Sequence, residues 1–202
     1  MKLYYSPGAC SLSPHIVLLE AGIAFEPVRV NTKTHQLKDG TDYYTISPNG
    51  YVPLLELDDG ERLTEGPAIV QYLADRAPDK NLAPANGTMA RYRLQEWLNF
   101  ITSELHKGIG GLFNAAMPEE AKALMRSRAA ERLKWVDLQL EGRSYLMGDA
   151  FSIPDAYLFT VVRWTQHVGI DISGLKQLGA FQARMAERPA VQAALKAEGL
   201  LK

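Results

Sequence analysis

The pattern of apolar and polar positions divides the chain into two regions of different periodicity. The first region opens with a short apolar run at residues 2–5, a Ser-Pro-Gly loop and an amphipathic helix that carries Ile16 and Leu18 and stops at Gly22. Residues 25–30 form the next apolar run. Strand, loop, helix and strand in this order predict a βαβ unit with parallel strands.

A hairpin and a helix complete the first region. After a polar stretch at residues 31–45, residues 52–57 form a strand, Asp58-Asp59-Gly60 is a hairpin turn signal and Arg62-Leu63 begins the return strand. Thr64-Glu65-Gly66-Pro67 then opens a helix. Parallel strands followed by an antiparallel hairpin and a helix predict an α/β thioredoxin-like N-terminal domain over residues 1–77.

The second region has a helical period almost throughout. Residues 78–87 are rich in Pro, Asn and Gly, which is typical of a linker. Beyond it the apolar residues repeat with helical spacing near 88–114, 119–141, 154–168 and 175–187, and a short segment follows. We therefore expect an all-α helical C-terminal domain over residues 88–202.

Composition and charge exclude several classes of protein. The chain of 202 residues has 22 Lys and Arg against 23 Asp and Glu, so its net charge of −1 gives no electrostatic drive toward nucleic acid or an anionic membrane. No apolar run approaches the roughly 20 residues of a membrane helix. The opening MKLYYSPGACS lacks the continuous apolar stretch of a signal peptide. We expect a cytoplasmic globular protein.

The cysteine and histidine content bears on metals and disulfides. A single cysteine, Cys10, excludes an internal disulfide and a site built from several thiolates. The four histidines, His15, His35, His106 and His167, lack the spacing of a metal site. We expect chemistry without a metal.

Cys10 is the first candidate for that chemistry. It lies in a loop just ahead of the first helix, where free N–H groups and the helix dipole stabilise a thiolate and lower the thiol pKa from about 8.5. The alternative is a small, buried and inert cysteine. The position before a helix favours a functional thiol.

Two further segments have the form of a peptide-binding site. A cis bond before Pro53 would expose the Val52 backbone to an extended ligand, although a trans bond is the commoner state of an X-Pro pair and the spacing alone favours it. Glu65, at a helix start, could accept an ammonium group beside N–H groups that favour a ligand carboxylate. A glutamate there also complements the helix dipole without any ligand.

The first long helix of the second region has a polar face. Helical projection places Asn99, Ser103 and His106 opposite a stripe formed by Leu94, Leu98, Ile101 and Leu105. The polar face could line a cleft or face water, and the periodicity favours water. Further on, Ser152 and Asp155 have the spacing of a helix capping box, so we interpret Asp155 as a folding residue and not as a catalyst.

The motifs together resemble one enzyme family. YYSPGACS, NGYVPLLELDDG, LTEGPAIVQYLAD, EWLNFITSELHK and FSIPDAYLF occur in the order typical of the bacterial beta-class glutathione S-transferases, and the resemblance covers the chain from end to end. It implies a thioredoxin-like domain that binds glutathione as co-substrate, a helical domain that binds a hydrophobic electrophilic small molecule, and a homodimer.

The resemblance also implies the site residues. Cys10 is similar to the family cysteine near the glutathione sulfur, and His106 to its companion from the helical domain. The resemblance implies main-chain binding of the cysteinyl moiety by Val52 after a cis Pro53. The glutathione residues it implies are Cys10, His35, Tyr51, Val52, Glu65, Gly66, Asn99, Ser103, Glu104 and His106, some of them reached from the partner subunit.

One position departs from the family pattern. His35 stands where close members often carry a lysine that meets the glycine carboxylate of glutathione, and a histidine with a pKa near about 6.5 is mostly neutral at pH 7. Glutathione binding is therefore expected to weaken as pH rises.

The use of the thiol is open. Donors near Cys10 and the His106 imidazole could stabilise the glutathione thiolate for conjugation, or Cys10 could form a mixed disulfide with glutathione and support thiol transfer or peroxidase activity. The alternative function is a non-catalytic protein of the same fold that binds glutathione or hydrophobic ligands. Retention of Cys10, Glu65 and His106 favours the enzyme.

Overall fold

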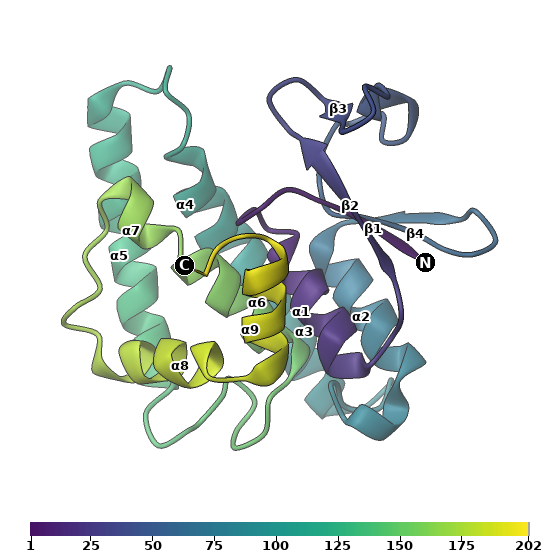
Figure 1. The fold of residues 1–202 in the computed structure, drawn as a ribbon. Coiled ribbons are helices and arrows are strands. Elements are labelled where there is room, and N and C mark those ends of the chain that lie inside the picture. The colour runs from purple at the N-terminus through teal and green to yellow at the C-terminus, as the bar shows by residue number, and fades with distance from the viewer. Residues whose placement is uncertain (202) are drawn as a thin grey trace. The chain divides into compact units, whose positions relative to one another are not determined.

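A computed structural model describes residues 1–201, which divide into two compact units, coloured along the chain in Figure 1. The first unit comprises residues 1–82 and the residues from Arg188 onward, and the second comprises residues 83–187. The break after residue 82 falls within the segment expected as a linker. The C-terminal residues differ from the expected division, because they pack with the first unit.

The first unit contains a five-stranded sheet in the order β3-β2-β1-β4-β5. β1 (Lys2–Tyr5) pairs in parallel with β2 (Glu26–Asn31) and antiparallel with β4 (Leu54–Glu56). β4 also pairs antiparallel with β5 (Arg62–Thr64). The βαβ unit and the hairpin are therefore confirmed. The short β3 (Gln36–Leu37), antiparallel to β2, lies in the polar stretch where no strand was expected.

The helix α1 (Leu12–Ala21) lies between two other helices of the first unit. It packs against α2 (Gly66–Arg76) and against α9 (Pro189–Ala197), and Gly22 ends it in the left-handed conformation with φ 67°. Residues 12–18 of α1 are all buried, so α1 is not the amphipathic helix that the sequence indicated. The reason is that two helices cover it. A 3-10 turn, η2 (Pro78–Lys80), follows α2.

A hydrophobic cluster anchors the loop that follows β3. Tyr43, in the short 3-10 helix η1 (Tyr43–Thr45), is fully buried against Tyr4, Val30 and Leu54 of three strands. The Tyr43 hydroxyl donates a hydrogen bond to the carbonyl oxygen of Tyr51, 3.0 Å away. This contact fixes the chain just ahead of β4.

The second unit is helical, as the sequence predicts. The apolar stripe of its first long segment is buried, and that segment contains a π-helical turn between two α-helices. Its elements are α3 (Met89–Phe100), η3 (Ile101–His106), α4 (Lys107–Gly111), α5 (Glu119–Gln139), α6 (Ile153–Val162), α7 (Thr165–Val168) and α8 (Lys176–Ala186).

The expected capping box is present at the start of α6. The Ser152 N–H and hydroxyl both donate to Asp155 Oδ2, at 2.8 and 2.9 Å, and the N–H of Leu146 donates to Oδ1 at 2.8 Å. Asp155 is fully buried. Its carboxylate therefore ties the loop before α6 to the helix.

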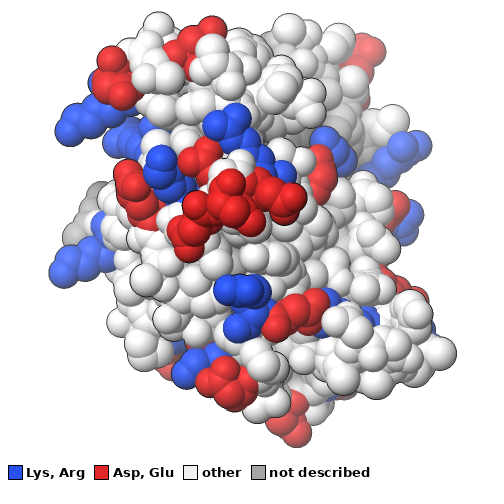
Figure 2. Space-filling model, turned by 90° about the vertical axis from the view of Figure 1, so that its right-hand side faces the viewer, with Lys and Arg blue, Asp and Glu red and all other residues white. Residues whose placement is uncertain are grey.

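The surface charge is mixed. On the face shown in Figure 2 a group of acidic side chains is bordered by Lys and Arg, and wide areas carry neither sign. Within residues 1–201 there is no helix long and apolar enough to cross a membrane.

Candidate functional site

Cys10 lies in the loop between β1 and α1, two residues before the helix begins. Its thiol is half-buried, and Sγ donates a hydrogen bond to the carbonyl oxygen of Val52, 3.2 Å away. The expected juxtaposition of the thiol and the Val52 backbone is therefore present. In this arrangement the sulfur keeps its proton as a donor.

The backbone of Val52 is placed for a second partner. The bond between Val52 and Pro53 is cis, as the family resemblance implies and against the trans bond that the spacing alone favours. Within residues 1–201 the Val52 N–H has no hydrogen-bond acceptor, and β4 begins only at Leu54. An extended peptide could therefore pair with this main chain.

Glu65 precedes α2 as expected. Its side chain is exposed, its backbone has the left-handed φ of 65°, and its carbonyl accepts the N–H groups of Ala68 and Ile69. A non-glycine residue at positive φ is uncommon and marks a conformation that the surrounding structure enforces. The first turn of α2, with Gly66 at its start, offers a carboxylate-binding helix terminus beside this exposed carboxylate.

His35 is held in a fixed position beside the same loop. Its imidazole stacks on Tyr44 with ring centroids 4.5 Å apart, and its Nδ1 is buried without a hydrogen-bond partner. A side chain at Gly50 would collide with both rings, since a Cβ there would lie 2.7 Å from each. Tyr51, the next candidate, is 72% exposed.

His106, in the second unit, is packed among aromatic side chains. Its ring meets Trp164 edge-on with centroids 5.0 Å apart, and its Nδ1 lies 2.5 Å from the hydroxyl of Tyr157. Burial, with a smaller contribution from the Lys107 cation, lowers the pKa of His106 from 6.5 to about 4. The imidazole is therefore neutral at physiological pH.

The hydrogen bonds around Tyr157 indicate which nitrogen of His106 carries the proton. The Thr102 hydroxyl donates to the carbonyl of Leu98 at 2.8 Å and lies 3.4 Å from the Tyr157 oxygen. The short contact of Tyr157 is the one to His106. A phenol that donates to Nδ1 leaves the imidazole proton on Nε2, so His106 can act there as a hydrogen-bond donor.

The other candidates of the second unit have surface positions. Asn99 and Ser103 are exposed, as the periodicity favoured, and Glu104 forms an ion pair with Arg132 at 2.8 Å. Their part in glutathione binding stays a prediction. The structure thus brings Cys10 and Val52 together in the first unit, whereas His106 belongs to the second.

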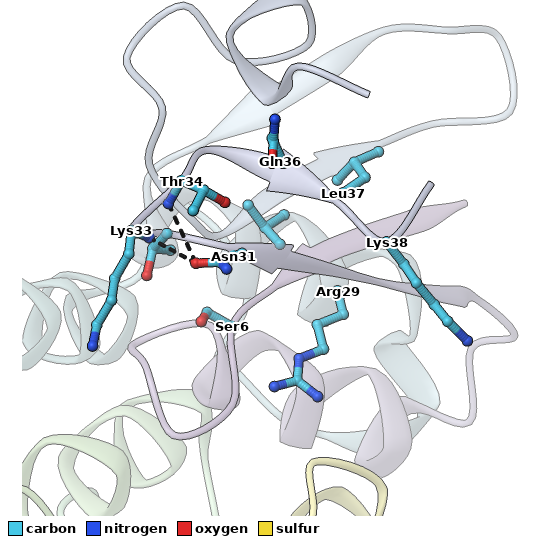
Figure 3. Close-up of a pocket in the computed structure, with 10 residues that line it drawn as sticks. Ser6, Arg29, Asn31, Lys33, Thr34, Gln36, Leu37 and Lys38 are labelled. Atoms are coloured by element: carbon cyan, nitrogen blue, oxygen red, sulfur yellow. Dashed lines mark hydrogen bonds between the residues drawn. The ribbon is translucent and has the colours of Figure 1, made fainter. Parts of the chain in front are cut away.

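A separate cavity of about 550 Å³ lies at the carboxyl end of β2 (Figure 3). Arg29, Lys33 and Lys38 line it, and none of the ten lining residues is an expected glutathione residue. In Figure 3 the Lys33 and Lys38 side chains point to opposite ends of the cavity. Their ammonium groups do not converge on one point, so we assign no ligand to the cavity.

Three functional-site neighbours were missed by sequence reasoning. Tyr157 and Trp164 were counted only as apolar helix residues, and Glu198 was not singled out. No local signal identifies them, because their partners are 51 residues or more away for Tyr157 and Glu198. A metal site was not expected, and residues 1–201 contain no group of three or more potential ligands.

Comparisons with known proteins agree with this arrangement. The model of the glutathione S-transferase N-terminal domain matches residues 8–76, and that of the C-terminal domain matches residues 100–189. The chain is 49% identical to glutathione S-transferase GstA of Escherichia coli O157:H7, over 99% of this chain and all of that protein. It is 41% identical to glutathione S-transferase GST-4.5 of Xanthomonas campestris, over 99% and 100%.

Solved structures give the same result. A ternary complex of BphK, a bacterial glutathione transferase, superposes with a TM-score of 0.97 at 57% identity, covering 99% of this chain and 100% of that one. A sphingomonad glutathione S-transferase complexed with glutathione gives a TM-score of 0.95 at 48% identity and covers both chains fully. With both domain models matched and relatives aligned along its length, the chain belongs to the glutathione S-transferase family and is an enzyme that uses glutathione as co-substrate.

Proposed function

We propose that glutathione binds to the first unit along the Val52 backbone and at the start of α2, and that its sulfur attacks hydrophobic electrophiles. The observation that carries this proposal is the Val52 main chain, whose N–H has no acceptor within residues 1–201 and whose carbonyl meets the Cys10 thiol at 3.2 Å. Glu65 supplies a carboxylate for the ammonium group of the γ-glutamyl end. A relative whose structure was solved with glutathione supports this substrate.

The chemistry requires a glutathione thiolate. The thiol gives up its proton, the sulfur forms a bond to the electrophilic carbon, and in a substitution the leaving group departs with its electron pair. Cys10 and the neutral imidazole of His106 would stabilise the negative sulfur by donating hydrogen bonds. His106 acts as a donor and not as a general base, because its Nδ1 is bonded to Tyr157.

A hydrophobic acceptor is favoured by the surroundings of His106. Trp164 packs edge-on against His106, and Phe113, 52% exposed, packs edge-on against Trp164 with centroids 6.1 Å apart. Aromatic rings offer a large apolar contact area to a small molecule. Named transferases among the relatives disfavour the alternative of a non-catalytic carrier.

We also propose a homodimer. The second unit exposes apolar side chains on α3 and α5, and Trp97, Phe100 and Trp135 form one aromatic cluster with ring centroids 4.7 to 5.8 Å apart. Trp135 is 42% exposed. Two-fold pairing is the commonest oligomer and would bury such a surface. Light scattering at micromolar concentration tests it, since a monomeric mass with full activity would contradict the dimer.

The free thiol bears on where the enzyme works. Cys10 forms no disulfide, and a reactive thiol that acts with reduced glutathione needs a reducing compartment. We therefore propose a cytoplasmic location, which fractionation of the producing cells tests.

Conjugation of an electrophilic aryl halide by the purified protein tests the proposed function. We expect a rate that depends on glutathione and exceeds the uncatalysed reaction. Binding of glutathione without any rate above background would favour the carrier instead.

A further inference from the structure

We infer that Glu198, the residue after α9, is a positioning residue that fixes the loop carrying Cys10. The inference rests on the proposed role of Cys10 but goes beyond it, because no motif of the glutathione site includes Glu198. It starts from a carboxylate that is completely buried yet lies far from any catalytic motif in the sequence.

Both oxygens of Glu198 contact groups of the first unit. Oε2 accepts a hydrogen bond from the N–H of Gly8 at 2.9 Å, and Oε1 lies 2.8 Å from Nδ1 of His15. The side chains of Glu198 and His15 are 0% and 3% exposed. Burying a carboxylate is costly unless partners compensate it, so these two contacts determine where the side chain can lie.

Gly8 lies within the loop that places the thiol, two residues before Cys10. The other backbone contacts of this loop are local: the Ala9 N–H donates to Ser6, and the Ser11 hydroxyl contacts the N–H and carbonyl of Ser6. The contact from Glu198 instead spans 190 residues. It therefore attaches the loop to the rest of the unit.

Two further contacts support the attachment. The His15 ring is packed edge-on by Tyr5 and Phe25, with centroids 5.8 and 5.3 Å away, so Glu198 bonds to a rigid partner. Leu200 also covers the loop, because its Cδ2 would lie 3.6 Å from a Cβ at Gly8. Gly8 has a positive φ of 72°, a conformation that glycine adopts without strain.

Glu20 provides a matched control. It forms a two-pronged ion pair with Arg188, at 2.7 and 2.9 Å, that also joins α1 to the α9 segment. This pair does not contact the loop of residues 6–11. Loss of Glu20 thus weakens the docking of the C-terminal segment without releasing Gly8.

The test is the rate at which iodoacetamide alkylates Cys10, measured up to the pH at which the rate no longer rises. Because Cys10 is the one cysteine of the sequence, the reaction reports this loop alone. We expect Glu198→Ala to raise the limiting rate at least about fivefold, since an unpaired buried N–H shifts the loop equilibrium by at least that factor. Glu198→Gln retains an acceptor for Gly8 and should restore a rate close to wild type, and Glu20→Gln should leave it unchanged.

Three results would overturn the inference: a wild-type rate in folded Glu198→Ala, the same increase in Glu20→Gln, or no restoration by Glu198→Gln. If Glu198→Ala does not fold, amide exchange of Gly8 in the wild-type protein decides, because exchange as fast as that of an open loop contradicts the contact. Failure of the proposed function would appear separately, as absent conjugation by the wild-type protein with the alkylation pattern intact.

Discussion

The hydroxyl of Tyr157 lies 2.5 Å from Nδ1 of His106, although the two residues are 51 positions apart and come from different helices. The contact gives a neutral imidazole a fixed direction. With Nδ1 accepting the phenol proton, Nε2 is the nitrogen that carries hydrogen. An imidazole of this kind stabilises negative charge by donating to it and takes up no proton during the reaction.

Tyr157→Phe removes this contact. We expect a fall of about 5- to 10-fold in kcat with little change in the KM for glutathione, the loss of one hydrogen bond acting on a transition-state donor. Nitrogen-15 NMR of the histidine rings should show a shift of the His106 proton between Nε2 and Nδ1. Tyr92→Phe, at a tyrosine that is 57% exposed, is the control. An unchanged tautomer in Tyr157→Phe would contradict the arrangement.

The lowered pKa of His106 makes stability depend on pH. The pKa falls from 6.5 to about 4 on folding, so the unfolded chain binds the proton more tightly between these values. The contribution to the free energy of unfolding is complete above about pH 6.5 and is lost as pH falls toward 4, up to about 3 kcal/mol. Urea unfolding of wild type and His106→Gln measures it. Parallel pH curves for the two proteins would disprove the shift.

The fold was largely predictable because its elements are encoded locally. Gly22 ends α1, Asp58-Asp59-Gly60 turns the hairpin, and Ser152 with Asp155 begins α6, each by short-range backbone chemistry. Burial is not encoded in this way. The sequence of α1 shows a helix but not that a helix from the end of the chain, α9, covers its second side.

The candidate site was predictable only where a motif carried it. Cys10, Val52 and Glu65 lie within motifs of the resemblance. Their surroundings come from distant partners, such as Tyr157 beside His106 and Glu198 beside Gly8, and no periodicity reveals a contact across 51 or 190 residues. The cis bond before Pro53 illustrates the same limit, because spacing alone favoured the trans form.

Asp155→Ala should destabilise the protein without an equal loss of activity. The buried carboxylate accepts hydrogen bonds from Ser152 and Leu146, and its removal leaves these donors unpaired. We expect a loss of about 3 kcal/mol or more in the free energy of unfolding. Asp149→Ala, at an exposed position nearby, should have little effect. An unchanged melting temperature together with lost turnover in Asp155→Ala would make this residue a catalyst.

Cys10→Ala separates the two uses of the thiol. Conjugation uses the sulfur of glutathione, so it should persist at a rate about 5- to 150-fold lower, the cost of one lost stabilising contact. Thiol transfer uses the protein sulfur itself and should disappear. Both assays are run on one preparation whose folding is checked by circular dichroism. Thiol transfer at the wild-type rate would disprove a covalent role for Cys10.

The central claim is that glutathione binds at the start of α2, and calorimetric titration of glutathione into Glu65→Ala and Glu61→Ala tests it most directly. Both glutamates are exposed, but only Glu65 adjoins the first turn of α2. We expect Glu65→Ala to raise the Kd at least about tenfold, since it removes a charge-assisted hydrogen bond, and Glu61→Ala to bind like wild type. Equal affinity of folded Glu65→Ala and wild type would contradict the account.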